Sequence, residues 1–338
     1  MTRPFQKVLI VGQPLFAGAP SDLLSLPKQQ CPDVTFQAWD TSVAGLTELL
    51  RAQNQVVINL DELTALEKWA PPGQVTTVIA DHLRTPRNLF DTQLPSHEWG
   101  AGIGLLATWA GWSYQRVLDL FNLPKNQLAA QVAILIREAR QGLNGRRLQV
   151  LGLSERPLLG ADSVLVADPD SLPVWGLAPQ DLAAVTDFYQ AATDYLASQT
   201  VLKLSGVAER DLNPARAEGS GVGHGLGALP ALLHGFRGRA LETFLTVSGL
   251  EAELAADTLV VAAVPQLHPQ TAAMSVLGVL KDLTVAASAP LIVFSDESSL
   301  SKHELFEWNV TACYGGRGRE LTPADYSRIL TQTWLRTR

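Results

Sequence analysis

The sequence predicts a two-domain α/β protein built around a Rossmann-like parallel α/β/α sheet. The chain has 338 residues, more than a single hydrophobic core usually serves, so two domains are expected. Short apolar runs alternate with segments of helical periodicity along residues 7–80, and this alternation is typical of a parallel sheet covered by helices on both faces. Apolar residues make up 46% and charged residues 17% of the chain, which suffices for two cores.

The first strands are short, apolar and rich in β-branched residues. Residues 7–12 read Lys-Val-Leu-Ile-Val-Gly, a run that ends at glycine and is typical of a buried parallel strand. Between Thr41 and Ala52 the apolar residues recur at helical spacing. The expected elements of this part are strands over residues 7–12, 34–39, 55–60 and 75–80 and a helix over residues 41–52.

Helices and strands also alternate in the rest of the chain. Residues 81–98 are polar and irregular, and we expect a crossing between domains there. Residues 125–141 carry an apolar stripe followed by Gly142-Leu143-Asn144-Gly145, a helix with its C-terminal stop. The full expectation is helices over 102–110, 112–121, 125–141, 178–198, 228–233, 271–282 and 323–335, and strands over 147–153, 163–167, 259–264 and 289–294.

Charge and cysteine content exclude several classes of function. The net charge of −7 provides no basic surface for nucleic acid or an anionic membrane. The two cysteines, Cys31 and Cys313, are too few for a disulfide framework or a structural zinc site. No apolar run reaches the ~18 residues of a membrane span, and the N-terminus does not resemble a signal peptide. We therefore expect a cytoplasmic protein without nucleic-acid or membrane partners.

A glycine-rich segment precedes one of the expected helices. Residues 218–229 read Glu-Gly-Ser-Gly-Val-Gly-His-Gly-Leu-Gly-Ala-Leu, and glycine lets backbone N–H groups approach a ligand closely. Such a segment at a helix start suits a phosphate or carboxylate. The alternative is a glycine-lined turn that lets a helix pack tightly on a sheet. The predicted phosphate-binding residues are Gly219, Gly221, Gly223, His224, Gly225 and Gly227.

The order of motifs along the chain resembles the bacterial glycerate kinase family. Residues 221–229 are similar to that family's Gly-Ala-Ala-Gly-Gly-Leu-Gly-Ala-Ala-Leu segment, and residues 156–160 are similar to its Asn-Pro-Leu-Leu-Gly. Residues 99–102 stand where the family has Tyr-Gly-Thr-Gly, and Asp40 stands where it has the Asp of Ala-Asp-Gly-Gly. Residues 257–261 and 270–271 bracket the place of its Gly-Glu-Gly-Arg-Ile-Asp-x-Gln-Thr.

The resemblance implies a domain plan and a reaction. Residues 1–81 and 231–338 would form the Rossmann-like domain, and residues 82–230 an inserted α/β domain that carries the glycine segment. Ligands in such folds bind beyond the carboxyl ends of the strands, often between domains. The implied activity is phosphorylation of glycerate or a similar small hydroxy acid, with ATP and Mg²⁺ as cofactors.

Several charged residues of the family pattern are replaced. Phosphoryl transfer depends on positioned cations and on metal-binding carboxylates, and this chain lacks most of those groups. We find no counterpart of the family's Gly-Leu-Gly-Gly-Ser-Ala-Thr-Asn-Asp-Gly-Gly segment. The replaced positions hold Val264, Pro265, Gln266 and His268, then Thr41 and Ser42 after Asp40, and a loop over residues 13–18 that has no lysine.

Two aspartates are the candidate catalytic residues. Asp40 follows an expected strand and could bind magnesium or substrate, or it could cap the next helix. Asp296 lies in the loop over residues 295–299 after a buried strand, which could hold a ligand or cap a helix. His224 could contact an anion or fill the space of a phosphate. The metal ligands are unknown.

Weaker candidates have plain structural alternatives. The tryptophans could line a substrate cleft or pack in a core, the Asp-His pair could serve acid–base chemistry or a turn, and the basic glycine-rich turn could contact an anion. The sequence has no metal-binding histidine spacing, no Gly-x-Ser-x-Gly elbow and no Walker-type motif. These candidates are Trp99, Trp109 and Trp112, then Asp81 and His82, and residues 315–319.

Three functions therefore stay open. The first is an ATP-dependent glycerate kinase, and the second is a non-catalytic relative that binds a small anion or a protein partner. The third is another reaction on the same scaffold that uses Asp40 and Asp296. We favour a relative whose kinase activity is lost or altered. Its partners would be a glycerate-like anion or a nucleotide, and the chain could pair with a second copy in a homodimer.

Overall fold

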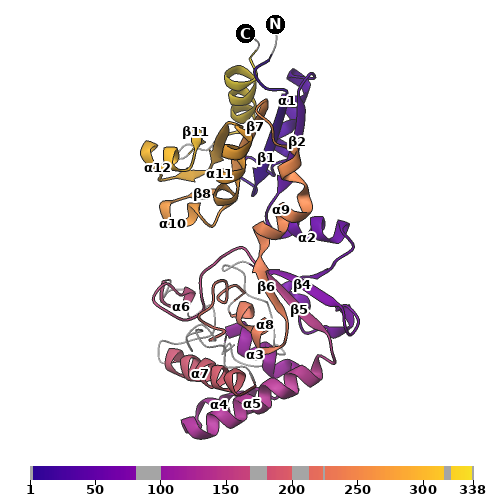
Figure 1. Ribbon diagram of the computed structural model, residues 1–338, viewed down its shortest axis with the longest axis vertical. Coiled ribbons are helices and arrows are strands. Elements are labelled where there is room, and N and C mark those ends of the chain that lie inside the picture. The colour runs from indigo at the N-terminus through magenta and orange to yellow at the C-terminus, as the bar shows by residue number, and fades with distance from the viewer. Residues whose placement is uncertain are drawn as a thin grey trace. The chain divides into compact units, whose positions relative to one another are not determined.

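The computed structural model describes residues 3–80, 100–167, 181–199, 213–223, 225–315 and 321–336. The chain divides into two compact units (Figure 1), and each has a parallel sheet of its own. Unit 1 comprises Met1–Leu49 and Leu241–Arg338, and unit 2 comprises Leu50–Ala240. The α/β fold class expected from the sequence is confirmed.

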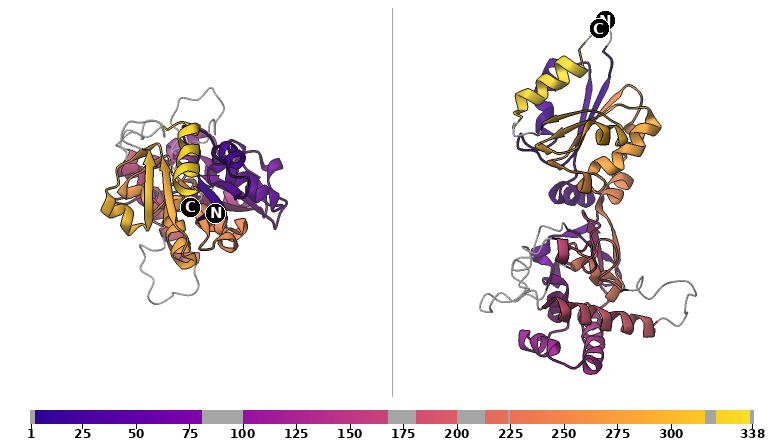
Figure 2. Two further views of the ribbon diagram at one scale, coloured as in Figure 1. Left: turned by 90° about the horizontal axis from the view of Figure 1, so that it is seen from above. Right: turned by 90° about the vertical axis from the view of Figure 1, so that its left-hand side faces the viewer.

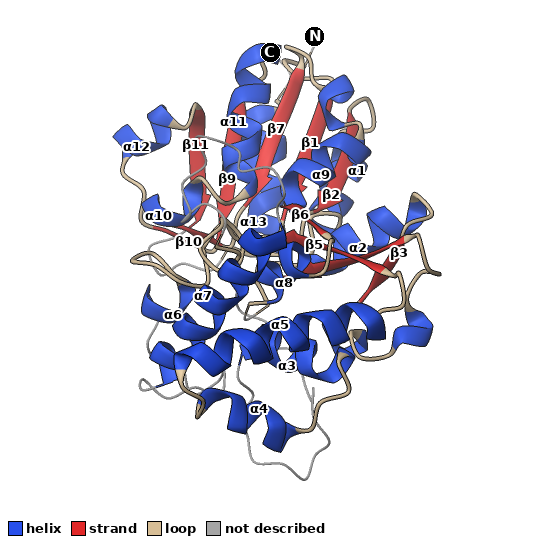
Figure 3. Ribbon diagram, turned by 60° about the horizontal axis from the view of Figure 1, so that its bottom comes forward, coloured by secondary structure: helices blue, strands red, loops and turns tan. Residues whose placement is uncertain are grey.

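Unit 1 contains a five-stranded sheet in the order β11-β9-β7-β1-β2, with every neighbouring pair parallel. This is the flavodoxin-like order, in which the strand order reverses between β1 and β7. Figure 3 shows the five strands side by side. Because all strands run in one direction, their carboxyl ends lie at one edge of the sheet. The strands are β1 (Lys7–Gly12), β2 (Thr35–Asp40), β7 (Thr258–Ala263), β9 (Leu291–Ser295) and β11 (Val310–Gly315).

Helices cover the two faces of this sheet because the strand residues alternate between them. Val8 and Ile10 join a core with Tyr326 and Leu330 of the C-terminal helix. In the right-hand view of Figure 2, that yellow helix and the orange helix α11 lie on opposite sides of the strands. The remaining elements are η1 (Asp22–Leu24), α1 (Ser25–Gln30), α2 (Val43–Ala52), α9 (Ala240–Ser248), η7 (Leu250–Glu253), β8 (Gln266–Leu267), α10 (Pro269–Ala272), α11 (Val276–Ala287), β10 (Glu297–Ser298), α12 (Lys302–Glu307), α13 (Pro323–Arg328) and the π-helical turn η8 (Ile329–Trp334).

Unit 2 contains a four-stranded parallel sheet in the order β3-β4-β5-β6. Its core lies between this sheet and α3, α5 and α7, with Leu135, Ile136 and Phe188 fully buried. The elements are β3 (Val56–Ile58), η2 (Leu60–Glu62), η3 (Leu66–Lys68), β4 (Val75–Ala80), α3 (Gly100–Trp109), α4 (Tyr114–Phe121), α5 (Lys125–Gly142), β5 (Arg147–Gly152), α6 (Val164–Ala167), α7 (Asp181–Gln199), η6 (Leu226–Ala228), α8 (Leu229–Leu232) and β6 (Phe236–Arg239).

The structure differs from the sequence-based expectation in the boundary between the units and in several elements. The division falls after Leu49 and Ala240, not after residues 81 and 230, because β3 and β4 pair with β5 and not with β1. Residues 164–167 form the short helix α6 where we expected a strand. Strands β6 and β11 were not expected.

The described helices give no candidate for a membrane span, since none is both long and apolar enough.

Candidate functional site

Asp40 ends β2 and holds the turn that leads into the following helix. Its Oδ1 accepts a hydrogen bond from the Ser42 backbone N at 2.8 Å, just before α2 begins. Gly45 of α2 packs on the same carboxyl group, since a Cβ there would lie 2.6 Å from Asp40 Cγ. The N-cap of this helix is Ser42, whose Oγ accepts from Gly45 N at 3.3 Å, so the capping alternative for Asp40 is wrong. A metal-binding role for Asp40 stays a prediction.

Asp296 follows β9 and holds the loop that follows β1. Its Oδ2 accepts a hydrogen bond from the Phe16 backbone N at 3.0 Å. Leu15 and Gly18 exchange backbone hydrogen bonds of 3.0 and 2.9 Å, which makes this loop a tight turn with the Phe16 ring 76% exposed at its tip. The carboxylate therefore positions the loop at which the family motif has a lysine.

The structure does not bring the two predicted catalytic aspartates together. Asp40 ends β2 and Asp296 follows β9, and β1 and β7 lie between these strands. With neighbouring strands about 4.8 Å apart, the two strand ends are separated by roughly 14 Å, too far for one ion to bind both. Among the described residues, no group of three or more His, Cys, Asp and Glu side chains could hold a metal ion.

The segment over residues 264–268 is engaged in strand pairing beyond the main sheet. Val264 N donates to Phe294 O at 2.9 Å, and Glu297 N donates to Pro265 O at 2.9 Å. Strands β8 and β10 continue this pairing in parallel. His268 Nδ1 lies 2.8 Å from Ser299 Oγ. The positions at which the family pattern has charged residues thus serve local backbone structure here.

The glycine segment of unit 2 uses most of its backbone donors within the chain. Gly219 N donates to Glu155 O at 2.7 Å, Gly221 N to Arg156 O at 3.0 Å, and Gly227 N to Val222 O at 3.2 Å. A phosphate could bind these amides only if the segment rearranged. The other amides that donate to backbone carbonyls are those of Ser220, Val222, Leu226 and Ala228.

Close packing explains why this segment is rich in glycine. A Cβ on Gly227 would lie 2.0 Å from Gly219 O, and one on Gly221 would lie 2.8 Å from Val164 Cγ2. Gly219, Gly223 and Gly225 have φ values of 71°, 54° and 95°, which side chains other than glycine rarely adopt. The structure therefore favours the packing alternative. His224 lies outside the described residues.

Two arginines of β6 lie beside the glycine segment. Arg237 Nη1 donates to Gly227 O at 3.2 Å, and Arg237 Cδ is 3.7 Å from the Cβ position of Gly219. Burial of its guanidinium lowers the pKa of Arg237, while the charge of Glu218 raises it. Arg239 Nη2 lies 3.1 Å from Glu155 Oε1 and 3.2 Å from Glu218 Oε2.

Within the described residues, the guanidinium of Arg237 lies against the glycine segment without an ion pair to a carboxylate. Arg239 is paired with carboxylates, whereas the one polar contact of Arg237 within the described part of the chain is a neutral carbonyl. A guanidinium recognises carboxylates and phosphates through planar, paired hydrogen bonds. These two arginines were not predicted as site residues from the sequence. The Arg-Gly-Arg pattern of residues 237–239 was the signal, but its position depends on β6 pairing with β5.

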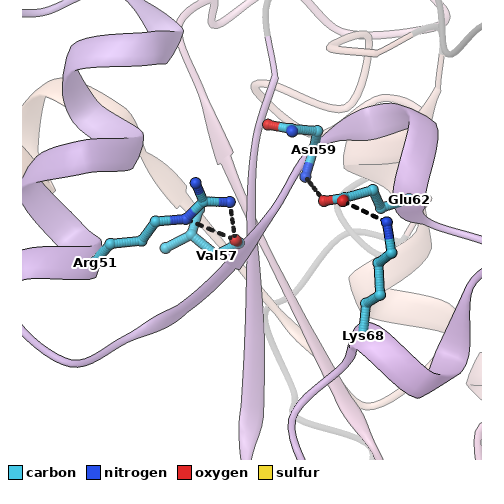
Figure 4. Close-up of polar contacts among 5 residues, drawn as sticks. All are labelled: Arg51, Val57, Asn59, Glu62 and Lys68. Atoms are coloured by element: carbon cyan, nitrogen blue, oxygen red, sulfur yellow. Dashed lines mark hydrogen bonds and ion pairs between the residues drawn. The ribbon is translucent and has the colours of Figure 1, made fainter.

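The carboxyl end of β3 carries a second group of charged side chains, which includes an ion pair (Figure 4). Glu62 accepts hydrogen bonds from Lys68 Nζ at 2.7 Å and from the Asn59 backbone N at 3.0 Å. The Lys68 hydrogen bond and then the Asn59 hydrogen bond lower the pKa of Glu62. Arg51 donates twice to Val57 O, at 2.7 and 3.2 Å. This cluster ties β3 to its neighbouring turns.

The described tryptophans among the weaker candidates are packed in unit 2. Trp109 Nε1 donates to Leu63 O at 3.1 Å. Trp112 is 5% exposed and donates to Glu138, and the Arg116 guanidinium lies 3.6 Å from its ring centre. These contacts favour the packing alternative. Trp99, the Asp81-His82 pair and residues 316–319 lie outside the described residues.

The fold is glycerate kinase-like. Over 95% of this chain and 94% of the other, the structure is similar to the crystal structure of the proposed glycerate kinase 2 from Salmonella typhimurium LT2, with a TM-score of 0.52 and 13% sequence identity. At that identity the likeness shows the fold alone. No protein-family model matches the sequence, and no curated protein matches it.

Proposed function

We propose that this glycerate kinase-like protein binds a small carboxylate anion beside the glycine segment of unit 2 and has lost ATP-dependent phosphoryl transfer. The ligand class is glycerate or a similar small hydroxy acid. The observation that carries the proposal is the Arg237 guanidinium against a glycine segment most of whose amides are already bonded.

The loss of phosphoryl transfer rests on what the candidate groups already do. Transfer from ATP needs cations and metal-bound carboxylates aimed at the moving phosphoryl group. Asp40 holds the turn before α2 through Oδ1, Asp296 fixes a loop through Oδ2, and residues 264–268 carry strand pairing. Among the described residues no group of three or more His, Cys, Asp and Glu side chains is assembled to hold the metal ion that this transfer needs.

Anion binding rests on Arg237. Its guanidinium is partly buried and contacts a carbonyl, so a carboxylate would gain a charge-assisted hydrogen bond that water does not fully match. The neighbouring ion pairs of Arg239 with Glu155 and Glu218 keep the net charge of the region small and the arrangement fixed.

The proposal predicts no ADP release above background when the protein is mixed with D-glycerate, ATP and Mg²⁺ in a coupled assay. Turnover on the order of 1 per second, typical of enzymes, would instead show an active kinase. ATP and Mg²⁺ would then be its cofactors, and the fold likeness is the observation that favours this second candidate.

Thermal unfolding in the presence of D-glycerate tests whether the protein binds this anion. At about five times its Kd, D-glycerate should raise the midpoint by roughly 2 to 4 °C. Arg237→Gln should remove most of this rise. Arg137→Gln, at an exposed position of α5 in the same unit, should keep it. Equal responses of both variants would rule out the Arg237 site.

A further inference from the structure

The helices α2 and α5 end in the same backbone geometry, each at an exposed asparagine. Asn54 follows α2 with a φ of 60°, and Asn144 follows α5 with a φ of 47°. Each backbone N donates over 2.9 Å to the carbonyl three residues earlier, which belongs to Arg51 or Gln141. Asparagine tolerates this left-handed conformation at helix ends. The two positions are therefore a matched pair within one chain.

The residue that follows the asparagine differs between the two positions. Gln55 N donates to Leu50 O at 3.2 Å, whereas Gly145 N donates to no acceptor within the described residues. Gly145 is exposed, and a Cβ added to it would meet only Pro72 Cβ, at 3.6 Å. The Gly145 amide thus has neither an internal acceptor nor a side chain of its own to shield it from water.

Positive charge follows this amide directly along the chain. Arg146 and Arg147 are the next two residues, and a nearby cation favours the charged form of a group that loses a proton to become an anion. A deprotonated Gly145 nitrogen is a nucleophile one residue beyond the side-chain amide of Asn144, and asparagine is among the chemically labile residues. The turn therefore presents a nucleophile beside an electrophilic carbonyl carbon.

We propose that Asn144-Gly145 is a site of spontaneous deamidation in the folded protein. The Gly145 N–H gives its proton to hydroxide, and the nitrogen attacks Asn144 Cγ. A bond forms between these two atoms, the bond from Cγ to the side-chain nitrogen breaks, and ammonia leaves with a proton from water. Water then opens the cyclic imide at either carbonyl, which yields aspartate or isoaspartate. This modification goes beyond the proposed function and does not depend on it.

The two products have different consequences for unit 2. Gly73 N donates to Gly145 O at 3.0 Å and Arg147 N donates to Gln74 O at 3.3 Å, which ties this turn to the residues before β4. Aspartate leaves the backbone unchanged, whereas isoaspartate routes the main chain through Cβ and Cγ and lengthens it. Isoaspartate therefore displaces the turn and weakens both hydrogen bonds.

The test is incubation of the full chain in mildly alkaline buffer, both folded and in urea, with peptide mapping by mass spectrometry. Each rate is expressed as the ratio of the folded rate to the rate in urea, so that sequence effects cancel. Exposed turns open at little cost, so folding should slow Asn144 by less than about tenfold. Asn144→Gly, which accepts the positive φ, should remove the isoaspartate signal of this peptide.

The variant Gln55→Gly supplies the matched control. It places the same Asn-Gly sequence at Asn54, while the following amide keeps its acceptor at Leu50 O. The ratio for Asn144 should be on the order of tenfold higher than that for Asn54 in this variant, because the bonded amide must first be released. Equal ratios at the two positions, or a wild-type Asn144 that folding slows by more than about tenfold, would overturn the proposal.

Discussion

Two tyrosine hydroxyls are buried without a hydrogen-bond partner in the described part of the chain. Tyr189 lies on α7 and Tyr326 on α13, and both are essentially unexposed. Burial raises the pKa of both phenols above the ordinary range. The Tyr189 hydroxyl lies 2.8 Å from the Cβ position of Gly102 and 3.5 Å from that of Gly225. It therefore lies in the tight packing between α3 and the glycine segment.

We expect Tyr189→Phe to raise the free energy of unfolding by about 1 kcal/mol, because it removes a buried donor that makes no hydrogen bond. Urea unfolding monitored by circular dichroism measures this. Tyr314→Phe is the matched comparison, since the Tyr314 hydroxyl accepts from Trp334 Nε1 at 3.0 Å and its loss should destabilise the protein. A destabilised Tyr189→Phe would mean that the hydroxyl has a partner in solution.

The backbone contacts of the glycine segment explain why its role was hard to predict from the sequence. The glycine segment was recognised from its composition, but composition does not reveal which carbonyls accept from its amides. Two of those carbonyls belong to Glu155 and Arg156, and Glu155 lies more than 60 positions before its partner Gly219. Only the tertiary fold brings these two carbonyls to the segment, so the sequence was compatible with both the packing role and the ligand role.

At the scale of elements, the glycine segment acts as a rigid junction between β5 and α8. Gly227→Ala should lower the free energy of unfolding by about 3 kcal/mol or more, because its Cβ would lie 2.0 Å from a backbone oxygen and backbone yields little. Gly238→Ala in β6 is the control. Its Cβ would lie 3.2 Å from the flexible end of Leu151, so we expect a change within about 1 kcal/mol. Chemical denaturation measures the free energy of unfolding of both variants. Equal values for the two variants would contradict close packing at Gly227.

Strands with uniform apolar runs were predictable and those with polar residues were not. Lys7–Gly12 and Val75–Ala80 match the expected ranges, because buried parallel strands read as continuous β-branched runs. Phe236–Arg239 contains two arginines and a glycine, and its strand conformation comes from pairing with β5 at the edge of the sheet. The helix Val164–Ala167 has a strand-like composition, and a short apolar run cannot distinguish the two conformations.

For the whole molecule, the sequence indicated two α/β parts but not the boundary between them. The strands β3 and β4 have the same apolar character as β1. The residues of a strand alone do not indicate which sheet it joins. That information lies in the pairing of β4 with β5 across an intervening helical region. The resemblance placed the boundary after residue 81, whereas contacts place it after Leu49.

Because each unit has its own sheet and its own core, we expect calorimetry to resolve two unfolding transitions. Leu259→Ala in β7 and Leu135→Ala in α5 remove fully buried side chains from unit 1 and unit 2. Each should cost about 2 to 5 kcal/mol and lower the midpoint of one transition only. A single transition that both variants shift equally would show that the units unfold together.

Strand β1 cannot pair with β7 until β7 has been synthesised, which imposes a delay on folding of unit 1. Residues 7–12 leave the ribosome early, but their partners at residues 258–263 follow only after all of unit 2 has been made. At about 5 to 20 residues per second, this interval is roughly 10 to 50 seconds. Unit 2 is continuous in the chain and can complete its sheet meanwhile. Chaperones that shield nascent apolar strands should therefore bind residues 7–12 until residues 258–263 emerge.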